Sequence, residues 1–243
     1  MTSDAPAGAL TRATPRVHLA TVTAVGPNMA ARRDAYLDGL LKRHSGCARA
    51  VITEALADGV PITEIYLQIL QPAMYEVGHR WAIDELNVAE EHYATAVTQQ
   101  LLDELSGRMR TPPRDGRLAI VSATPGEQHA LGPRMVADFL EADGWEVLPL
   151  GASTPAADLA ALVDSERPDV VALSTATAGS LPGIVDALER LRRLRPRPCL
   201  VVGGQFWTAE TSLAAVELGA DLAVRDLRQL APMLRERIPP RDD

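Results

Sequence analysis

Residues 118–132 read Leu-Ala-Ile-Val-Ser-Ala-Thr-Pro-Gly-Glu-Gln-His-Ala-Leu-Gly, an apolar run followed by a loop that contains two glycines. The first six of these residues have the short, apolar composition of a buried strand, and Pro133 to Asp143 have the spacing of an amphipathic helix. A strand, a glycine-containing loop and a helix in this order open a βαβ unit. The loop after the first strand of such a unit lies at the carboxyl edge of the sheet, where ligands bind.

The rest of the C-terminal half repeats the alternation of strand and helix. Further apolar runs that predict strands lie at Glu146–Leu150, Val170–Ser174, Leu200–Val202 and Leu222–Val224. Helical patterns separate them, and a last one covers Leu227 to Arg237. The alternation predicts that residues 117–243 form a Rossmann-like domain with a doubly wound, five-stranded parallel sheet. We expect the flavodoxin-like strand order 2-1-3-4-5.

Residues 29–110 are helical in pattern almost throughout. Helical spacing is found in four segments, at Ala30–Arg43, Gly46–Ala57, Ile62–Ile83 and Val88–Arg108. Asn87, with Glu90 three positions later, resembles a capping box, and Pro72 predicts a kink inside the third helix. Four helices with short connections predict a four-helix bundle that caps the sheet.

Two polar segments bound these domains. Residues 111–116, Thr-Pro-Pro-Arg-Asp-Gly, predict a linker between the bundle and the sheet. Residues 1–28 are rich in Ala, Thr and Pro and predict a flexible N-terminal arm, although Val17 to Val25 alternates weakly like a strand.

Composition narrows the possible functions. The chain has 243 residues and a formal net charge of −8, which argues against a general nucleic-acid surface because phosphate binding needs concentrated Lys and Arg. The only cysteines, Cys47 and Cys199, fall in different predicted domains, so a disulfide framework is not expected. Since no apolar run approaches the length of a membrane span, the sequence predicts a cytoplasmic protein without membrane contact.

Three loops carry the residues that suggest a binding site. Under the expected strand order, the loops after the first, third and fourth strands meet at the carboxyl edge. They contribute the candidates Glu127, His129, Gly132, Ser174, Thr175, Gly203 and Gly204. Glycines without side chains leave a slot beside the sheet, and no phosphate-binding glycine fingerprint is present. Each feature alone is ordinary, a surface histidine, a strand-end hydroxyl or a tight turn, but together they predict a site for a large planar ligand with a tail.

These loops resemble the cobalamin-binding signature Asp-x-His-x-x-Gly … Ser-x-Leu … Gly-Gly. The resemblance implies that His129 displaces the dimethylbenzimidazole base and ligates cobalt from below. The freed nucleotide tail would enter a channel lined by Ser174 and Gly203-Gly204. Glu127 would orient the histidine through its second ring nitrogen. The chain departs from the signature twice, with Glu127 in place of Asp and Ala176 in place of Leu.

The helical half carries a second resemblance. Trp81, followed after a short turn by Glu91 and His92, is similar to the Trp … Glu-His pattern of the CarH/LitR-type adenosylcobalamin photoreceptors. It implies that Trp81 packs against an adenosyl group and that Glu91 binds its ribose, with His92 beside them. Ala82 stands where CarH carries the histidine that takes the upper cobalt position after photolysis. Residues 1–28 are too few for the winged helix-turn-helix domain of that family.

Two functions follow from these resemblances. The first is a stand-alone adenosylcobalamin light sensor that is not an enzyme and passes its signal to a partner protein, such as a regulator, or changes its self-association. The second is a corrinoid carrier subunit of a methyltransferase system, which would bind methylcobalamin. Cobalamin storage is a third option, and a mutase is disfavoured because the chain has no substrate-binding barrel.

Overall fold

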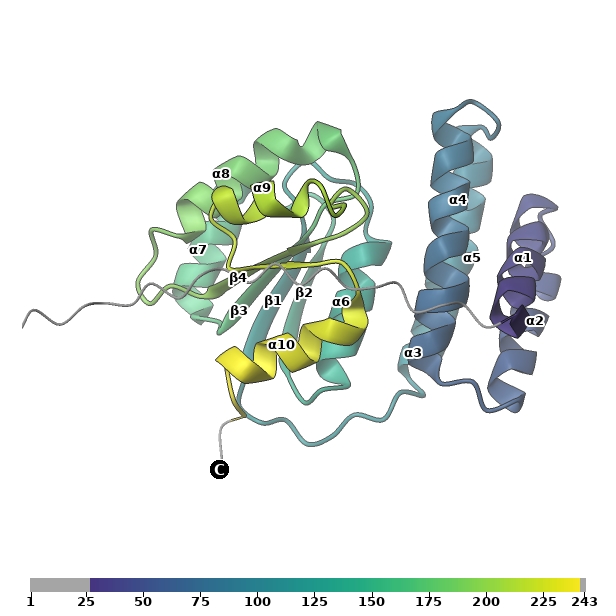
Figure 1. The fold of residues 1–243 in the computed structure, drawn as a ribbon, viewed down its shortest axis with the longest axis horizontal. Coiled ribbons are helices and arrows are strands. Elements are labelled where there is room, and N and C mark those ends of the chain that lie inside the picture. Colours follow the sequence, from purple (N-terminus) through teal and green to yellow (C-terminus); the bar gives the residue numbers. More distant parts are fainter. Residues whose placement is uncertain (1–26, 241–243) are drawn as a thin grey trace, which may run out of the picture.

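The computed structural model describes residues 27–240 (Figure 1). The predicted N-terminal arm lies outside the described residues, except that Pro27 and Asn28 begin the first helix. The chain folds into a helical part, here called the cap, and a sheet domain. The cap consists of α1 (Pro27–Leu41), α2 (Ser45–Ala57), α3 (Ile62–Ile65), the π-helical turn η1 (Tyr66–Leu70), α4 (Gln71–Ala82) and α5 (Val88–Ser106).

The third predicted helix of the cap is continuous in space but changes its winding. The π-helical turn η1 separates α3 from α4 and ends just before Pro72. A proline inside an α-helix removes a hydrogen bond and clashes with the carbonyl group four residues earlier. A single π-helical turn before the proline, rather than the simple kink predicted from sequence, accommodates the ring.

The first residue of α5 is fixed by the predicted capping box. The Asn87 side chain accepts hydrogen bonds from the backbone N–H groups of Ala89 and Glu90 at 2.9 and 3.1 Å, and the Glu90 carboxylate accepts one from the Asn87 N–H at 3.1 Å. Buried apolar residues of α5 then pack with Tyr36 of α1 and with η1 to form the cap core.

The sheet domain has five parallel strands in the predicted order, β2-β1-β3-β4-β5. They are β1 (Leu118–Ala123), β2 (Glu146–Gly151), β3 (Val170–Ser174), β4 (Cys199–Gly203) and β5 (Leu222–Val224). Successive residues point to opposite faces of the sheet, and both faces are buried. The near-continuous apolar runs of the central strands follow from this double coverage.

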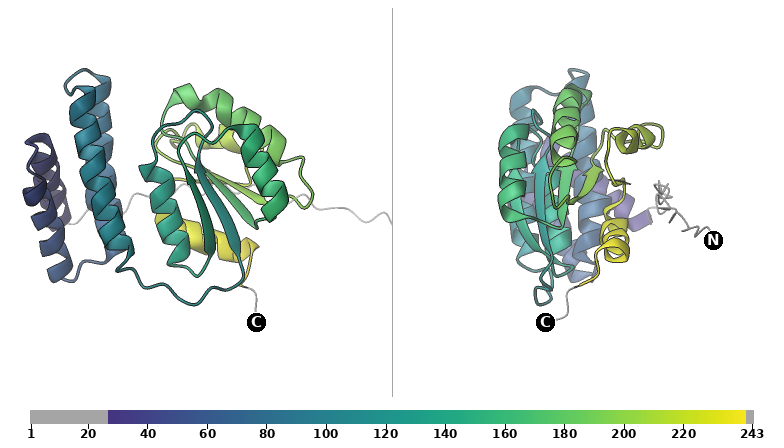
Figure 2. Two further views of the ribbon diagram at one scale, coloured as in Figure 1. Left: turned by 180° about the vertical axis from the view of Figure 1, so that it is seen from behind. Right: turned by 90° about the vertical axis from the view of Figure 1, so that its left-hand side faces the viewer.

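Helices cover both faces of the sheet (Figure 2). On one face, α6 (Leu131–Glu141) and α10 (Leu230–Arg237) pack on Val121 and its neighbours. On the other face lie α7 (Ala156–Glu166), α8 (Leu181–Leu191) and α9 (Ser212–Glu217). The 3-10 turns η2 (Ala178–Ser180) and η3 (Leu227–Gln229) precede α8 and α10.

The cap stands beside the sheet domain, with α4 and α5 facing it and α1 and α2 on the far side (Figures 1 and 2). Met135 of α6 belongs to the hydrophobic core of the cap, so the two parts share apolar packing. The buried hydroxyl of Tyr66 donates a hydrogen bond to Asp138 of α6 at 2.9 Å. Arg134 of α6 pairs with Asp103 of α5 at 2.7 Å, and Arg228 pairs with Glu64 of α3 at 2.7 Å.

Both cysteines are free. Cys47 is exposed on α2 and Cys199 is partly buried at the start of β4. Burial raises the pKa of the Cys199 thiol to about 12, so the thiol stays protonated at neutral pH. Within residues 27–240, no helix combines the length and the apolar character needed to cross a membrane.

Candidate functional site

The loop between β1 and α6 brings Glu127 and His129 together at the carboxyl edge of the sheet. The Glu127 side chain is buried, whereas 44 % of the His129 side chain is exposed. One carboxylate oxygen of Glu127 pairs with Nδ1 of His129 and also accepts a hydrogen bond from the His129 backbone N–H at 3.2 Å. Because an ionised carboxylate only accepts, Nδ1 donates to Glu127, and Nε2 is the ring nitrogen without a hydrogen-bond partner among the described residues.

The second oxygen of Glu127 is held by the segment that follows β3. It accepts hydrogen bonds from the backbone N–H groups of Ala176 and Thr177 at 3.0 Å each, and from the hydroxyl of Ser180 at 3.0 Å. The Thr177 hydroxyl adds a fourth at 3.2 Å. The loop that carries His129 is thereby attached to the loop after β3, so the imidazole has a fixed orientation.

The charge of Glu127 is stabilised by the same contacts. Burial by itself raises the pKa of this carboxyl group, but the hydrogen bonds from His129, Ala176 and Ser180 outweigh it and lower the pKa to about 2. The site therefore contains a permanent buried anion at neutral pH, directed at the inner nitrogen of an exposed imidazole.

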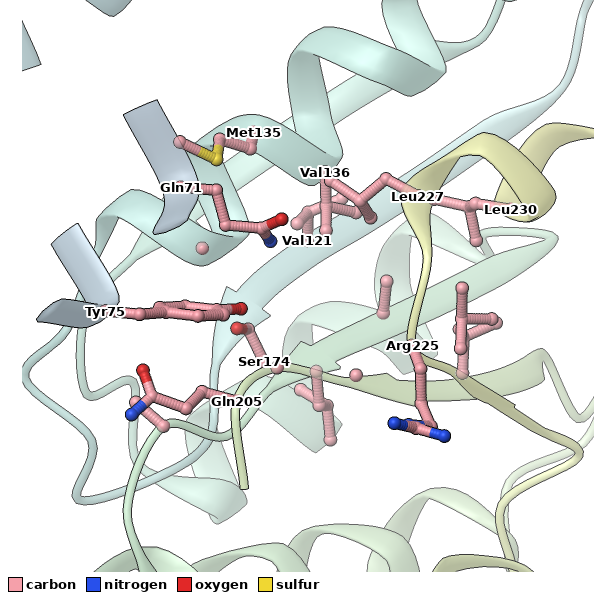
Figure 3. A pocket seen from close by; sticks show the side chains of 18 residues that line it. Gln71, Tyr75, Val121, Met135, Val136, Ser174, Gln205, Arg225, Leu227 and Leu230 are labelled. Carbon is pink, nitrogen blue, oxygen red and sulfur yellow. The ribbon is translucent and has the colours of Figure 1, made fainter. Parts of the chain in front are cut away.

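A cavity of about 100 Å³ lies next to this loop, between the sheet, α6, α10 and the cap helix α4 (Figure 3). Its walls are mostly apolar. Its lining comprises Gln71, Tyr75, Val121, Gly132, Met135, Val136, Ala172, Leu173, Ser174, Ala176, Val201, Gly203, Gly204, Gln205, Val224, Arg225, Leu227 and Leu230. Of the sequence-predicted residues, Gly132, Ser174, Gly203 and Gly204 meet at this cavity.

The glycines at the cavity allow close approach of neighbouring segments. A Cβ atom on Gly132 would lie 2.6 Å from the Ser174 hydroxyl oxygen, so a side chain there would force that hydroxyl to rotate away. Gly204 has a φ of +105°, and a Cβ there would lie 2.3 Å from the Thr175 carbonyl oxygen. The glycines therefore border the cavity with backbone alone, and the space that side chains at Gly203 and Gly204 would need is taken by neighbouring backbone.

Thr175 does not line the cavity. Its hydroxyl is fully buried and shares a hydrogen bond of 2.7 Å with the hydroxyl of Thr124, and its backbone N–H donates to the Gly203 carbonyl at 2.9 Å. These contacts hold the ends of β1, β3 and β4 together.

The three cap candidates lie at the α4–α5 turn and do not line the cavity. Trp81 is 41 % exposed near the end of α4. Glu91 accepts a hydrogen bond from Thr95 at 2.7 Å and pairs with Nδ1 of His92 at 2.6 Å. The turn forms the end of the cap away from the linker (Figure 1).

Sequence reasoning missed several residues that the fold adds to the site. Gln71 and Tyr75 are four positions apart on α4 and therefore share the helix face that closes the cavity. Figure 3 shows the Tyr75 hydroxyl pointing toward Ser174. Ser180 could have been noticed as a hydroxyl shortly after β3, and Arg225 as the residue after the last strand.

The side chains at this edge could hold a metal ion only if most of the ligands of that ion come from a cofactor. The part of the chain that the structure describes contains no cluster of three or more His, Cys, Asp and Glu side chains able to hold a bare ion. His129 offers a single nitrogen. Such a site fits a metal whose other ligands belong to a cofactor, because one imidazole then completes the coordination.

Comparison with known proteins agrees with this geometry. Residues 117–230 match a family model described as a B12 binding domain, and residues 32–106 match a second model with the same description. The HTH-type transcriptional repressor CarH of Myxococcus xanthus is 35 % identical over 156 residues, which are 63 % of this chain and 51 % of the repressor. The chain thus spans about half the length of this relative.

Corrinoid proteins are also similar. Monomethylamine corrinoid protein 2 of Methanosarcina acetivorans is 25 % identical over 193 residues, 77 % of this chain and 88 % of that protein. The solved structure of the Methanosarcina barkeri monomethylamine corrinoid protein superposes with a TM-score of 0.72 at 21 % identity, covering 86 % of this chain and 99 % of that one, and so has the same fold. With one B12 binding domain match over its cap and another over its sheet domain, the chain belongs to the B12-binding domain family.

Proposed function

We propose that the chain binds cobalamin in the base-off form, with His129 as the lower cobalt ligand. The observation that carries this proposal is the attachment of the His129 ring to the buried, ionised Glu127. That contact fixes the tautomer and leaves Nε2 free at the surface of the sheet edge. Metal-binding histidines are commonly oriented in this way through their second nitrogen.

The cavity supports the second half of the proposal, a site for the nucleotide tail. At about 100 Å³ the cavity is smaller than the ~150 Å³ cavity that holds a benzene ring, so the two-ring base of the tail would enter only with movement of the side chains that line it. Sites for whole ligands take ~300–1,000 Å³. We assign the flat base of the tail to this cavity because Ser174 and the Gly203-Gly204 pair line it, and we assign the macrocycle to the surface between His129 and the cap.

For the upper face we propose an adenosyl group and a light-sensing role. Adenosylcobalamin, when bound, supplies a cobalt–carbon bond that light cleaves. Trp81 is exposed and offers a flat apolar surface to adenine, and Glu91 is oriented by Thr95 and His92 to accept from ribose hydroxyls. Loss of these contacts in light would free the cap, and the output would be a partner protein or altered self-association. In this role the chain is a sensor and not a catalyst.

The test is an absorption spectrum with adenosylcobalamin, recorded in the dark and after illumination, together with the oligomeric state. We expect a base-off, histidine-ligated spectrum that His129→Ala abolishes and that the matched control His44→Ala, at the exposed α1–α2 turn, retains. Illumination should change both spectrum and oligomeric state or partner binding. An unchanged spectrum for His129→Ala would overturn the assignment of the ligand.

The similarity to monomethylamine corrinoid proteins over most of their length favours a second candidate, a corrinoid carrier of a methyltransferase system. The two functions differ in the upper ligand. If the chain is a sensor, Trp81→Ala should weaken adenosylcobalamin binding far more than methylcobalamin binding. A tighter affinity of the native chain for methylcobalamin, unaffected by this substitution, would favour the carrier.

A further inference from the structure

Arg225 is the one charged residue among those that line the cavity beside the sheet edge, within the described part of the chain. The other polar groups there are the amides of Gln71 and Gln205 and the hydroxyls of Tyr75 and Ser174. Figure 3 shows Arg225 across the cavity from Met135. An isolated guanidinium at the rim of an otherwise uncharged cavity attracts an anionic group.

The register of the sheet explains why Arg225 stands at this place. Gly203 of β4 is the partner of Val224 of β5, so Arg225 follows directly beside Gly204. Neither glycine has a side chain that could separate the Arg225 guanidinium from the cavity. The glycine pair and the arginine therefore border the same opening.

The nearby carboxylates are already engaged with another arginine. Asp226, next in the chain, accepts from the backbone N–H of Arg228 at 2.9 Å and pairs with its guanidinium at 3.2 Å. Arg228 in turn bridges to Glu64 of the cap at 2.7 Å, and this contact lowers the pKa of Glu64. Arg225 itself has no hydrogen bond or ion pair with the residues that the structure describes, although the chain carries a net charge of −8.

We propose that Arg225 binds the phosphodiester of the nucleotide loop and so makes the chain selective for complete corrinoids over those that lack the nucleotide. This inference rests on the proposed base-off binding mode, in which the tail enters the cavity. The phosphodiester is the only anionic group of the cobalamin tail, and a guanidinium matches two of its oxygens with parallel N–H donors.

The experiment compares the affinities of hydroxocobalamin and of cobinamide, which has neither nucleotide nor phosphate, for the native chain and for Arg225→Gln. We expect the substitution to weaken hydroxocobalamin binding about tenfold, within the range for a hydrogen bond to a charged group, and to leave cobinamide binding unchanged. Arg225→Lys should retain part of the preference. Added salt should reduce the preference of the native chain and have less effect on Arg225→Gln.

The controls separate the possible outcomes. Arg190→Gln removes an exposed arginine on α8 and should change neither affinity. The urea midpoint of Arg225→Gln should equal that of the native chain, because Arg225 has no hydrogen-bond or ion-pair partner in the described part of the fold that the substitution could remove. Equal weakening of both ligands, or of neither, in Arg225→Gln overturns the inference while leaving the binding mode intact. A native chain that binds neither corrinoid overturns the proposed function and this inference together.

Discussion

The carboxylate of Glu127 is bound by groups from two separate loops, one after β1 and one after β3. These hydrogen bonds favour the ionised form, and together they lower the pKa of the group to about 2 from an ordinary value of 4.5. A carboxyl group whose pKa is lower in the folded than in the unfolded chain stabilises the fold above the unfolded value. That contribution is lost as the pH falls toward the folded value.

Glu127→Gln should therefore lower the free energy of unfolding by about 3 kcal/mol at pH 7, and the difference from the native chain should shrink between pH 4.5 and 2. Urea unfolding at pH 7 and pH 3 measures both values. The control is Glu104→Gln, which breaks an exposed ion pair with Arg49 and should cost less than about 1 kcal/mol. A constant difference across this pH range would contradict the ionised state of Glu127.

Gly204→Ala tests the close backbone packing between Gly204 and Thr175 at the sheet edge. Its φ of +105° disfavours a side chain, and the added Cβ would meet the Thr175 carbonyl oxygen, which is backbone and cannot move aside cheaply. We expect a loss of about 2 kcal/mol or more of unfolding free energy, measured by urea denaturation. Gly78→Ala in α4, where no atom lies within 4 Å, should be neutral or stabilising by up to about 1 kcal/mol. Equal effects at both positions would refute the steric argument.

At this scale the sequence predicted the contact between Glu127 and His129 and, through the expected strand order, the meeting of Gly132 and Ser174 with the Gly203-Gly204 pair, but it missed partners that depend on loop folding or domain docking. Glu127 and His129 are two positions apart, so their contact could be inferred from the loop itself. Ser180 reaches Glu127 only because the 3-10 turn after β3 folds back over the edge. Tyr75 joins the cavity only through the docking of the two domains.

Helix α5 carries Glu91 and His92, and its first turn depends on one side chain. Asn87 satisfies backbone donors that no carbonyl group can reach at a helix start. Asn87→Ala should lower the unfolding free energy by about 1 kcal/mol, whereas Asn87→Asp should retain most of it. Urea denaturation compares the two variants. An alanine variant as stable as the native chain would mean that the hydrogen bonds of the Asn87 side chain contribute nothing to stability.

The bounds of strands and helices were predicted well where the residue composition and the spacing of apolar residues indicate the same element. β1, β3 and β5 have the predicted bounds because apolar runs between polar breaks leave no alternative register. The strand order was also correct. The π-helical turn before Pro72 was not predicted, because a proline pattern indicates a disturbance of the helix but not how the helix absorbs it.

On the scale of the whole molecule, the polar contacts between cap and sheet domain within the described residues join α3, η1 and the end of α5 to α6 and η3. Tyr66 and Asp138 are 72 positions apart, and Glu64 and Arg228 are 164 apart. No local pattern predicts such pairs. The relative position of the two domains could for that reason not be predicted from the sequence.

Removing two of these contacts should loosen the cap. In the double variant Tyr66→Phe/Arg228→Gln, we expect the amides of α4 and α5 to exchange hydrogen about tenfold faster than in the native chain, because one lost buried hydrogen bond and one part-exposed ion pair together cost about 1–2 kcal/mol. Exchange in β1 and β3 should be nearly unchanged. Hydrogen exchange followed by mass spectrometry measures both.

Tyr36→Phe is the matched control for this test. It deletes a buried hydroxyl that bonds to Thr98 at 2.8 Å wholly within the cap. It should destabilise the cap core without altering how the cap is held against the sheet domain. If it accelerates exchange in α4 and α5 as much as the double variant does, the interdomain contacts have no separate role.

Within the described residues, the polar contacts to the sheet domain lie near the linker end of the cap, and Trp81 lies near the other end of the continuous helix formed by α3, η1 and α4. The sixteen residues from Tyr66 to Trp81 span ~22 Å at about 1.5 Å rise per residue, so a tilt of about 10° at the linker end displaces the tip by roughly 4 Å. Under the proposed function, such a tilt would pivot the cap about its linker end. Because α1 and α2 share a hydrophobic core with α4 and α5, they would move with them, and the outer surface of the cap would shift when contacts at the tip are lost.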